Sequence, residues 1–278
     1  ETEVIALVIR AFAGPGEPVL MHAPCFPLYR IFATMEARTP VYVPMGKDFD
    51  LQMDRYLEAL KSRPKIAFLT SPHNPSGQLV SEADVRRVCE AVHEDTLVVL
   101  DEAYIHYSET EGSVHLLREY SNLMVLRTFS KAFGLAGLRV GFGMSGNPAL
   151  VEPLRRLKPT WNVGQLQLAG AIAGLQDDAH VQRAVKTVVD MRAYVADQMA
   201  RMTRFRMVPH SRANFFLTEI VDPALDSDSV FEGLLKRGVI VKNGNHIEGL
   251  GSRYLRVDLN LKVHMDRFLN ALNDLPAR

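Results

Sequence analysis

The sequence predicts an α/β fold in which a mainly parallel sheet is sandwiched between helices and is followed by a smaller α+β unit. Short apolar runs at residues 65–70, 96–101 and 123–127 alternate with segments of helical periodicity, as in βαβ units. These runs are apolar without alternation, which is typical of strands covered on both faces. We expect a large domain over residues 1–163, then connecting helices and a small C-terminal domain over residues 164–278.

Each further element follows from periodicity or from a residue that stops it. Apolar residues recur at helical spacing over residues 1–13, and the Gly-Pro-Gly sequence at residues 14–16 ends that helix. Ser81 is the expected N-cap of a helix over residues 81–93, with Asp84 three residues on. The other expected strands are 18–22, 40–44, 139–144, 213–219, 239–241 and 254–259. One more helix is expected from the turn at 24–27 to about residue 37, and another ends over residues 56–62. The remaining helical segments are 165–202 and 264–273.

Composition narrows the class of protein. The chain has 278 residues, of which 47% are hydrophobic and 23% are charged, as in a globular protein with a real core. Lysine plus arginine and aspartate plus glutamate both number 32, so we expect no nucleic-acid or membrane partner. Two cysteines, Cys25 and Cys89, and no visible signal peptide favour a reduced, cytoplasmic protein. We expect no metal site.

One stretch, residues 128–139 (T-F-S-K-A-F-G-L-A-G-L-R), is organised around Lys131. A lysine at a strand exit suits an imine-forming nucleophile, and Gly134 and Gly137 would let the backbone come close to a ligand. Near this lysine, the hydroxyls of Thr128 and Ser130 and the guanidinium of Arg139 suit a phosphate group. The two requirements together describe pyridoxal 5'-phosphate (PLP), which enzymes hold as a lysine Schiff base.

Two further loops place polar residues at strand exits, where open parallel sheets bind ligands. Asp101 follows residues 96–100, and its carboxylate would keep the pyridine nitrogen of PLP protonated, as an electron sink requires. Asn74 and Tyr104 would donate hydrogen bonds to the phenolate oxygen of the ring.

Each of these residues also has an ordinary interpretation. Lys131 alone could be a solvated surface lysine, Asp101 a helix cap, Asn74 a turn former and Tyr104 part of the core. What favours the cofactor is the joint pattern, because all these residues fall at strand exits beside one lysine.

The chain resembles fold-type I PLP enzymes, and within them the class I/II aminotransferases of the histidinol-phosphate aminotransferase type. The matching stretches are S-P-H-N-P-S-G at 71–77, D-E-A-Y at 101–104, T-F-S-K-A-F-G-L-A-G-L-R-V-G at 128–141 and L-R-V at 255–257. The resemblance covers essentially the whole chain. It implies an aminotransferase, with an amino acid and a 2-oxo acid or phosphorylated ketone as substrates, that works as a homodimer.

The resemblance also implies residue roles. Lys131 would form the Schiff base and then move the proton at the substrate Cα, with Asp101 and Tyr104 as the other catalytic residues. Phe26 matches the aromatic residue that stacks on the ring, and Arg256 matches the arginine that binds the substrate α-carboxylate.

Several positions depart from the family pattern. Glu1 and Thr2 stand where a glycine-containing turn normally contacts the phosphate, so Thr2 is a further cofactor candidate and the family's preceding segment is expected to be missing. Lys242 stands in place of a second arginine that recognises the substrate side chain. Trp161 replaces a usual tyrosine or phenylalanine. These changes bear on the identity of the substrate. A decarboxylase resembling threonine-phosphate decarboxylase remains open, because the same cofactor and motifs serve both reactions. A non-catalytic PLP-fold protein also remains open, because the preceding segment is expected to be missing.

Overall fold

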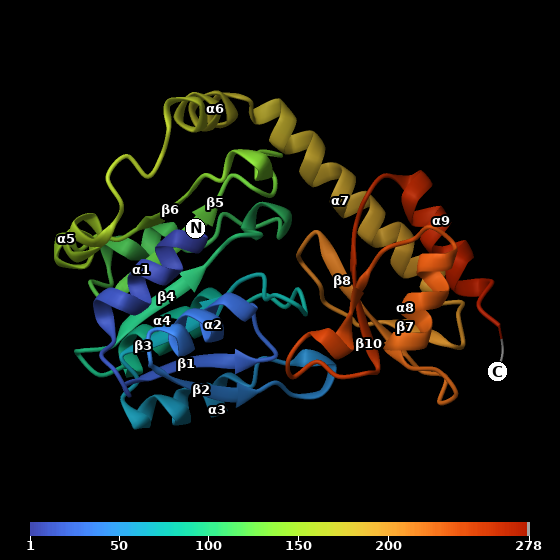
Figure 1. Cartoon of the computed structure of the whole chain (residues 1–278), viewed down its shortest axis with the longest axis horizontal. Coiled ribbons are helices and arrows are strands. Elements are labelled where there is room, and N and C mark those ends of the chain that lie inside the picture. Colours follow the sequence, from blue (N-terminus) through green and yellow to red (C-terminus); the bar gives the residue numbers. More distant parts are fainter. Residues whose placement is uncertain (277–278) are drawn as a thin grey trace.

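The computed structural model describes residues 1–276 and contains two β-sheets (Figure 1). The first sheet has the strand order β2-β1-β3-β4-β5-β6. All its neighbouring strands run parallel except β6, which is antiparallel to β5. The strands are β1 (Pro18–Ala23), β2 (Thr39–Pro44), β3 (Ile66–Thr70), β4 (Leu97–Asp101), β5 (Leu123–Thr128) and β6 (Gly141–Met144). The predicted mainly parallel sheet is confirmed.

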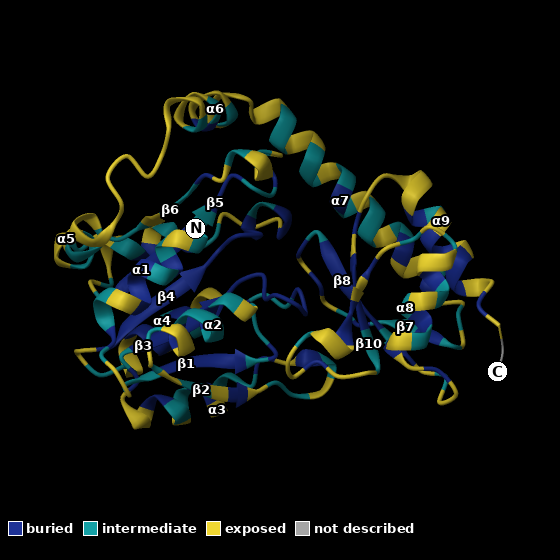
Figure 2. Ribbon diagram, viewed as in Figure 1, coloured by how far each residue is buried: buried dark blue, intermediate teal, exposed yellow. Residues whose placement is uncertain are grey.

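Helices cover both faces of this sheet. Side chains alternate between the two faces along each strand, so neighbouring residues of one strand pack under different helices. Val99 of β4 belongs to the apolar cluster under α1 (Thr2–Phe12), α2 (Pro27–Met35) and α5 (Pro148–Leu157). Its neighbours Val98 and Leu100 belong to the cluster under α3 (Met53–Ala59) and α4 (Glu82–Ala91). All residues of β3 and β4 are buried (Figure 2). The uninterrupted apolar runs in the sequence reflect this burial on two faces.

The second sheet is antiparallel, with the strand order β7-β8-β10-β9. Its strands are β7 (Phe205–Met207), β8 (Phe215–Ile220), β9 (Lys242–Asn243) and β10 (Tyr254–Asp258). It shares one apolar cluster with α7 (Asp178–Met199), α8 (Ser227–Lys236) and α9 (Lys262–Asn273). A further helix, α6 (Gln165–Gln176), precedes the long α7 that leads from one sheet to the other (Figure 1).

The C-terminal half differs from the expectation at residues 239–241. The expected strand at residues 239–241 is wrong, since β9 begins at Lys242. Gly238, with φ of 71°, ends α8, and the Val239 N–H still donates to Leu234 O, so this segment continues the helix end. The apolar V-I-V run has the composition of a strand, but Ile240 is 79% exposed and the run does not form one.

Helices α5 and α8 were not expected from periodicity, although α8 begins with a capping box between Asp226 and Ser229. The predicted N-cap of α4 is confirmed, because the Ser81 side chain accepts from the Asp84 N–H. Among the described residues, no helix is long and apolar enough to cross a membrane.

Two buried histidines lie beside the carboxyl edge of the first sheet. His22 stacks on Tyr56, with ring centroids 4.7 Å apart, and its Nε2 is 2.8 Å from Leu51 O. His73 meets His22 edge to face at 5.9 Å, and its Nδ1 is 2.9 Å from Ser76 Oγ. Burial lowers the pKa of His22 to about 4 and that of His73 to about 3. Both rings are therefore neutral in the folded protein near pH 7.

These two histidines predict a pH dependence of stability. In the unfolded chain each binds a proton near pH 6.5, so the unfolded state takes up protons that the native state does not, and native stability is lost as the pH falls from about 6.5 to about 4. Each histidine contributes a slope of about 1.4 kcal/mol per pH unit in that window. We expect the double variant His22→Gln, His73→Asn to show a flatter dependence in urea unfolding of the apo-protein at about pH 7, 6 and 5. Equal slopes in the two proteins would contradict this account.

Candidate active site

The carboxyl edge of the first sheet opens onto a cleft of about 640 Å³. All nine cofactor-binding residues predicted from the sequence line this one cleft, which also receives the N-terminal turn of α1. They are Thr2, Phe26, Asn74, Asp101, Tyr104, Thr128, Ser130, Lys131 and Arg139. Segments that are far apart in the sequence thus bring an amine, a carboxylate, hydroxyls and a guanidinium together.

Lys131 follows β5 in the turn that leads to β6. Its Nζ lies 4.7 Å from the centre of the Tyr104 ring. Burial, followed by the positive charge of Arg256, lowers the pKa of Lys131. A lowered pKa increases the fraction of neutral amine, which is the nucleophilic form.

Asp101 is the last residue of β4 and is almost fully buried. Its Oδ1 accepts a hydrogen bond from the Ala103 N–H at 3.0 Å. Its Oδ2 accepts from the Tyr29 hydroxyl at 2.5 Å. These two contacts fix the orientation of the carboxylate at the cleft wall.

Asn74 and Tyr104 connect the cleft with the second sheet. Arg256 of β10 donates from Nη1 to Asn74 Oδ1 at 3.1 Å. Because a guanidinium only donates, this contact orients the amide and leaves its Nδ2 as a donor for a ligand. The Tyr104 ring meets Phe215 of β8 edge to face at 4.9 Å. Burial raises the pKa of Tyr104, so its hydroxyl keeps its proton and can donate.

The hydroxyls around the lysine are linked to each other. Thr128 Oγ1 donates to Ser130 Oγ at 3.0 Å and accepts from the Ser130 N–H at 3.1 Å. Arg139 lies exposed in the same turn, where its Nη1 donates to Ala136 O at 2.7 Å. A hydroxyl pair and a guanidinium on one turn suit a phosphate group.

The two glycines of this turn differ in what the fold requires of them. Gly134 has φ of 69°, a left-handed conformation that glycine adopts without strain, so it shapes the turn after Lys131. A Cβ at Gly137 would meet no protein atom within 4 Å, so packing within the chain does not require a glycine there. The expected close approach of this backbone to a ligand stays a prediction.

The two predicted substrate residues do not line the cleft, but they lie side by side behind Asn74. Arg256 and Lys242 are paired across β10 and β9. The Arg256 guanidinium also lies 4.5 Å from the centre of the Phe215 ring, and its buried Nε has no partner among the described residues. Partial desolvation, followed by the positive charge of Arg256, lowers the pKa of Lys242.

A buried ion pair that the sequence did not single out ties the ends of β4 and β5 together. Glu102, 1% exposed in its side chain, accepts from Arg127 at 2.7 Å and, through its other oxygen, from the Ser113 N–H at 2.6 Å. Burial raises the pKa of Glu102, against the opposite effect of Arg127. Gly112, with φ of 76°, leaves room for the pair, since a Cβ there would lie 2.7 Å from the carboxylate. The signal in the sequence that could have indicated this ion pair is a charged residue close to the end of each of the two predicted strands.

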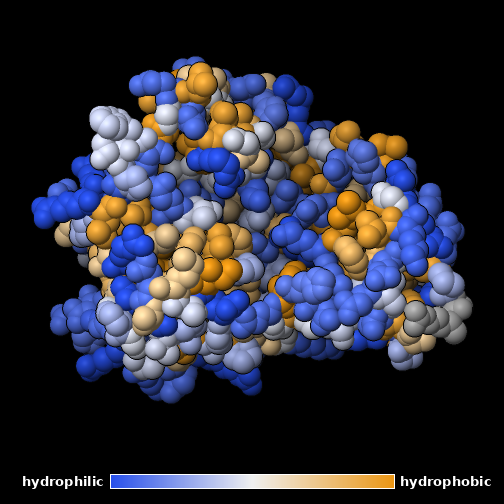
Figure 3. Space-filling model, in the orientation of Figure 1, coloured by the Kyte–Doolittle hydropathy of each residue, from blue (hydrophilic) through white to orange (hydrophobic). Residues whose placement is uncertain are grey.

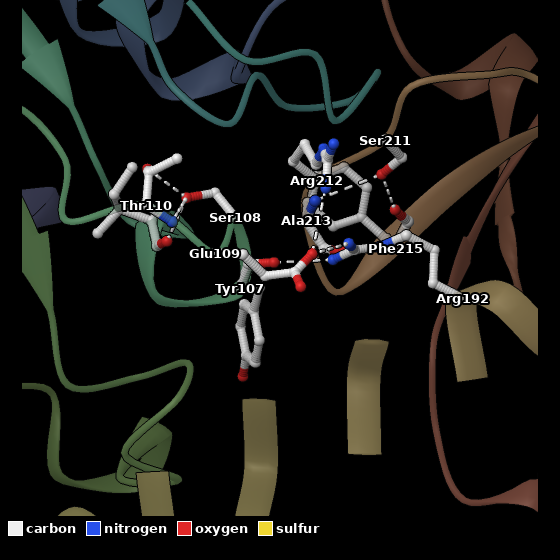
Figure 4. Close-up of polar contacts among 10 residues, drawn as sticks. Tyr107, Ser108, Glu109, Thr110, Arg192, Ser211, Arg212, Ala213 and Phe215 are labelled. Carbon is white, nitrogen blue, oxygen red and sulfur yellow. Dashed lines mark hydrogen bonds and ion pairs between the residues drawn. The ribbon is translucent and has the colours of Figure 1, made fainter. Parts of the chain in front are cut away.

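A second tie joins the loop after β4 to the second sheet (Figure 4). Arg192 of α7 donates from Nη2 to the carbonyl oxygens of Tyr107, at 2.9 Å, and Ala213, at 3.0 Å. Tyr107 belongs to the segment that carries Tyr104, and Ala213 precedes Phe215. One arginine therefore holds both partners of the aromatic contact at the cleft.

Glu1 is also part of the cleft, beside the carboxylate of Asp101. Burial and then the negative charge of Asp101 raise the pKa of the Glu1 side chain well above its usual value. Glu1 and Thr2 were expected at the phosphate, and both line the cleft.

Comparison with known proteins shows the family of this chain. The family model for aminotransferase class I and II matches residues 2–272. The histidinol-phosphate aminotransferase of Anaeromyxobacter sp. is 38% identical over 274 residues, which covers 97% of this chain and 73% of that protein.

Solved structures share the fold. The crystal structure of histidinol-phosphate aminotransferase from Clostridium acetobutylicum has a TM-score of 0.91 at 21% identity, and the match covers 99% of this chain and 82% of that one. The enzyme from Sinorhizobium meliloti in complex with PLP has a TM-score of 0.83 at 24% identity, with 97% and 73% covered.

The sheet, the cleft at its carboxyl edge and the donor set around Lys131 define a PLP-dependent enzyme, because an amine, a buried carboxylate and a turn with hydroxyls and a guanidinium fit that cofactor. The chain belongs to the class I and II aminotransferase family, and it is a PLP-dependent aminotransferase. The predicted fold class, cofactor and reaction type are confirmed.

Proposed function

We propose that this enzyme moves an amino group from an amino acid, with glutamate as the expected donor, to a 2-oxo acid or a phosphorylated ketone of the histidinol-phosphate type. One observation carries this proposal. Lys131, whose pKa is lowered, lines the same cleft as Asp101 and the turn with the hydroxyls of Thr128 and Ser130. The names of the relatives support the phosphorylated substrate.

Within this proposal each side chain has a physical role. Bound PLP supplies the electron sink for the bond that breaks at the substrate Cα. Lys131 would hold the cofactor covalently and would then move the proton at that carbon, since its lowered pKa makes the amine a competent base. Asp101 would keep the ring nitrogen protonated by its opposite charge. Asn74 and Tyr104 would donate to the phenolate oxygen, and Phe26 would pack on the ring.

The phosphate and the substrate would be held by charged or hydroxyl groups. Thr128, Ser130 and Arg139, with the N-terminal turn of α1 at Thr2, are the proposed phosphate ligands. Arg256 would bind the substrate α-carboxylate as a fork, and its unpartnered Nε supports an additional acceptor there. Lys242, its cross-strand neighbour, would meet a distal anion of the substrate.

We also propose a homodimer in the cytoplasm. Large apolar side chains are exposed along residues 157–175, on and before α6, where apolar atoms gather at the surface (Figure 3). They are Leu157, Trp161, Val163, Leu166, Leu168, Ile172 and Leu175. Such a contiguous stretch supports a protein partner. Two cysteines without a disulfide, Cys25 and Cys89, support a reducing compartment.

The reaction is tested first at Lys131. We expect Lys131→Ala to abolish the borohydride-reducible link to PLP and to lower turnover by about 10²–10⁴-fold, the usual contribution of a proton-transfer group. Adding glutamate to the wild type should convert the visible band of the bound cofactor to that of pyridoxamine phosphate. Lys158→Ala, at a lysine that lines the same cleft, is the matched control and should keep both properties. A reducible adduct in Lys131→Ala, or carbon dioxide release in place of the spectral change, would refute the assignment.

Substrate recognition is tested by separating the two cross-strand cations. Arg256→Ala should raise KM for every α-carboxylate substrate, glutamate included, by about 10- to 100-fold, because a charge-assisted pair is lost. Lys242→Ala should raise KM only for substrates with a second anion. Steady-state kinetics with glutamate, alanine and a phosphorylated substrate distinguish the two effects. A uniform loss across all substrates in both variants would show that the roles are not divided.

The homodimer is tested at the exposed apolar stretch. Leu166→Asp places a charge where the partner would pack, so we expect association to weaken by about tenfold or more. Ile240→Asp, at an equally exposed apolar residue on the second unit, is the control. Sedimentation velocity over a range of concentrations gives the dissociation constants. An unchanged dimer in Leu166→Asp would remove this surface from the interface.

A further inference from the structure

Behind the cleft wall, a tyrosine that does not line the cleft holds the carboxylate of Asp101. Tyr29 of α2 has no exposed surface, with a relative exposure of 0%. Its hydroxyl lies 2.5 Å from Asp101 Oδ2 and 3.0 Å from Thr70 Oγ1. Thr70 and Asp101 end adjacent strands in direct register, so one hydroxyl reaches both.

The direction of the hydrogen bonds follows from the groups present. An ionised carboxylate only accepts, so the single phenol proton of Tyr29 is donated to Asp101, and the Thr70 hydroxyl donates to Tyr29. Burial, and then the negative charge of Asp101, raise the pKa of Tyr29 well above its usual value, so the phenol remains protonated. The result is a directed chain of hydrogen bonds that ends on Asp101.

The ring of Tyr29 is fixed on two sides. It stacks on Phe68 of β3 with ring centroids 4.4 Å apart and 11° between the planes. It meets Phe26 edge to face at 5.5 Å. These two contacts place the hydroxyl against the carboxylate, and the Ala103 N–H donates to the other carboxylate oxygen.

We propose that Tyr29 is a positioning residue that orients the carboxylate of Asp101, so that the proton shared with the cofactor stays on the ring nitrogen. This inference rests on the proposed role of Asp101 opposite that nitrogen. The hydrogen bond donated by Tyr29 fixes the direction of Oδ2, so that the carboxylate can face the protonated ring nitrogen. Without the bond, the carboxylate would be held less firmly, and the proton on the ring nitrogen would be less well stabilised.

The test uses Tyr29→Phe, which removes one oxygen and keeps both ring contacts. The holoenzyme is prepared with PLP labelled with ¹⁵N in the ring, and the ¹⁵N chemical shift reports where the proton resides. We expect the shift to move toward the value of a neutral pyridine and kcat to fall by about 10- to 100-fold, as for a lost hydrogen bond to a charged group, with little change in KM. Thr70→Val should move the shift in the same direction by a smaller amount.

The chain offers a matched control in Tyr56. This tyrosine is also 0% exposed, and its hydroxyl donates to Phe68 O at 2.8 Å and not to Asp101. Tyr56→Phe should therefore leave the ¹⁵N shift unchanged, even if it lowers stability. A shift in this control equal to that of Tyr29→Phe would show a general packing effect and overturn the proposal.

Asp101→Asn separates the failure of this inference from that of the proposed function. If Asp101→Asn changes the ¹⁵N shift and Tyr29→Phe does not, Tyr29 only packs, and the inference is wrong while the role of Asp101 stands. If Asp101→Asn leaves the shift of the wild type, the carboxylate does not face the ring nitrogen, and both ideas fall together.

Discussion

The site depends on the parallel register of three neighbouring strands. β3, β4 and β5 are paired so that Thr70 lies opposite Asp101, and Asp101 lies opposite Leu126. A slip by one residue would draw the Asp101 carboxylate into the apolar interior or push a leucine into the cleft, and both changes are costly. The polar side chains at the carboxyl edge are therefore fixed relative to one another by the sheet, which is the preorganisation that catalysis requires.

The ion pair between Glu102 and Arg127 extends this constraint to the loops. A buried ion pair adds little net stability over well-packed apolar side chains, because desolvation offsets most of the attraction, and the raised pKa of Glu102 reflects that cost. Its geometric effect is larger. Glu102 is the first residue after β4 and Arg127 is the second-last residue of β5, so the pair fixes the ends of these two strands relative to each other. Breaking it would leave an uncompensated buried charge beside the cofactor residues.

Much of the fold and of the cofactor site could be predicted because both depend on local patterns. Apolar runs and a lysine at a strand exit are visible in the sequence, and the parallel sheet brings their ends together. The strand expected at residues 239–241 failed because the V-I-V run looks the same whether it pairs with β10 or ends α8. Tyr29 could not be recognised from its sequence position, because its importance lies in a contact with Asp101, which is distant in the chain.

The two predicted substrate residues belong to the other sheet, and two contacts join that sheet to residues of the cleft. Arg256 donates to Asn74, and Phe215 packs against Tyr104, so each of these two cleft residues has a partner on the antiparallel sheet. The other guanidinium partner of Arg256, Asp258, is 59% exposed in its side chain, and such a pair is weak and exchangeable. In the proposed function a substrate carboxylate can therefore replace Asp258 while Asn74 stays in place. Substrate binding would then not disturb the donor aimed at the cofactor, because the two acceptors use different nitrogens of one guanidinium.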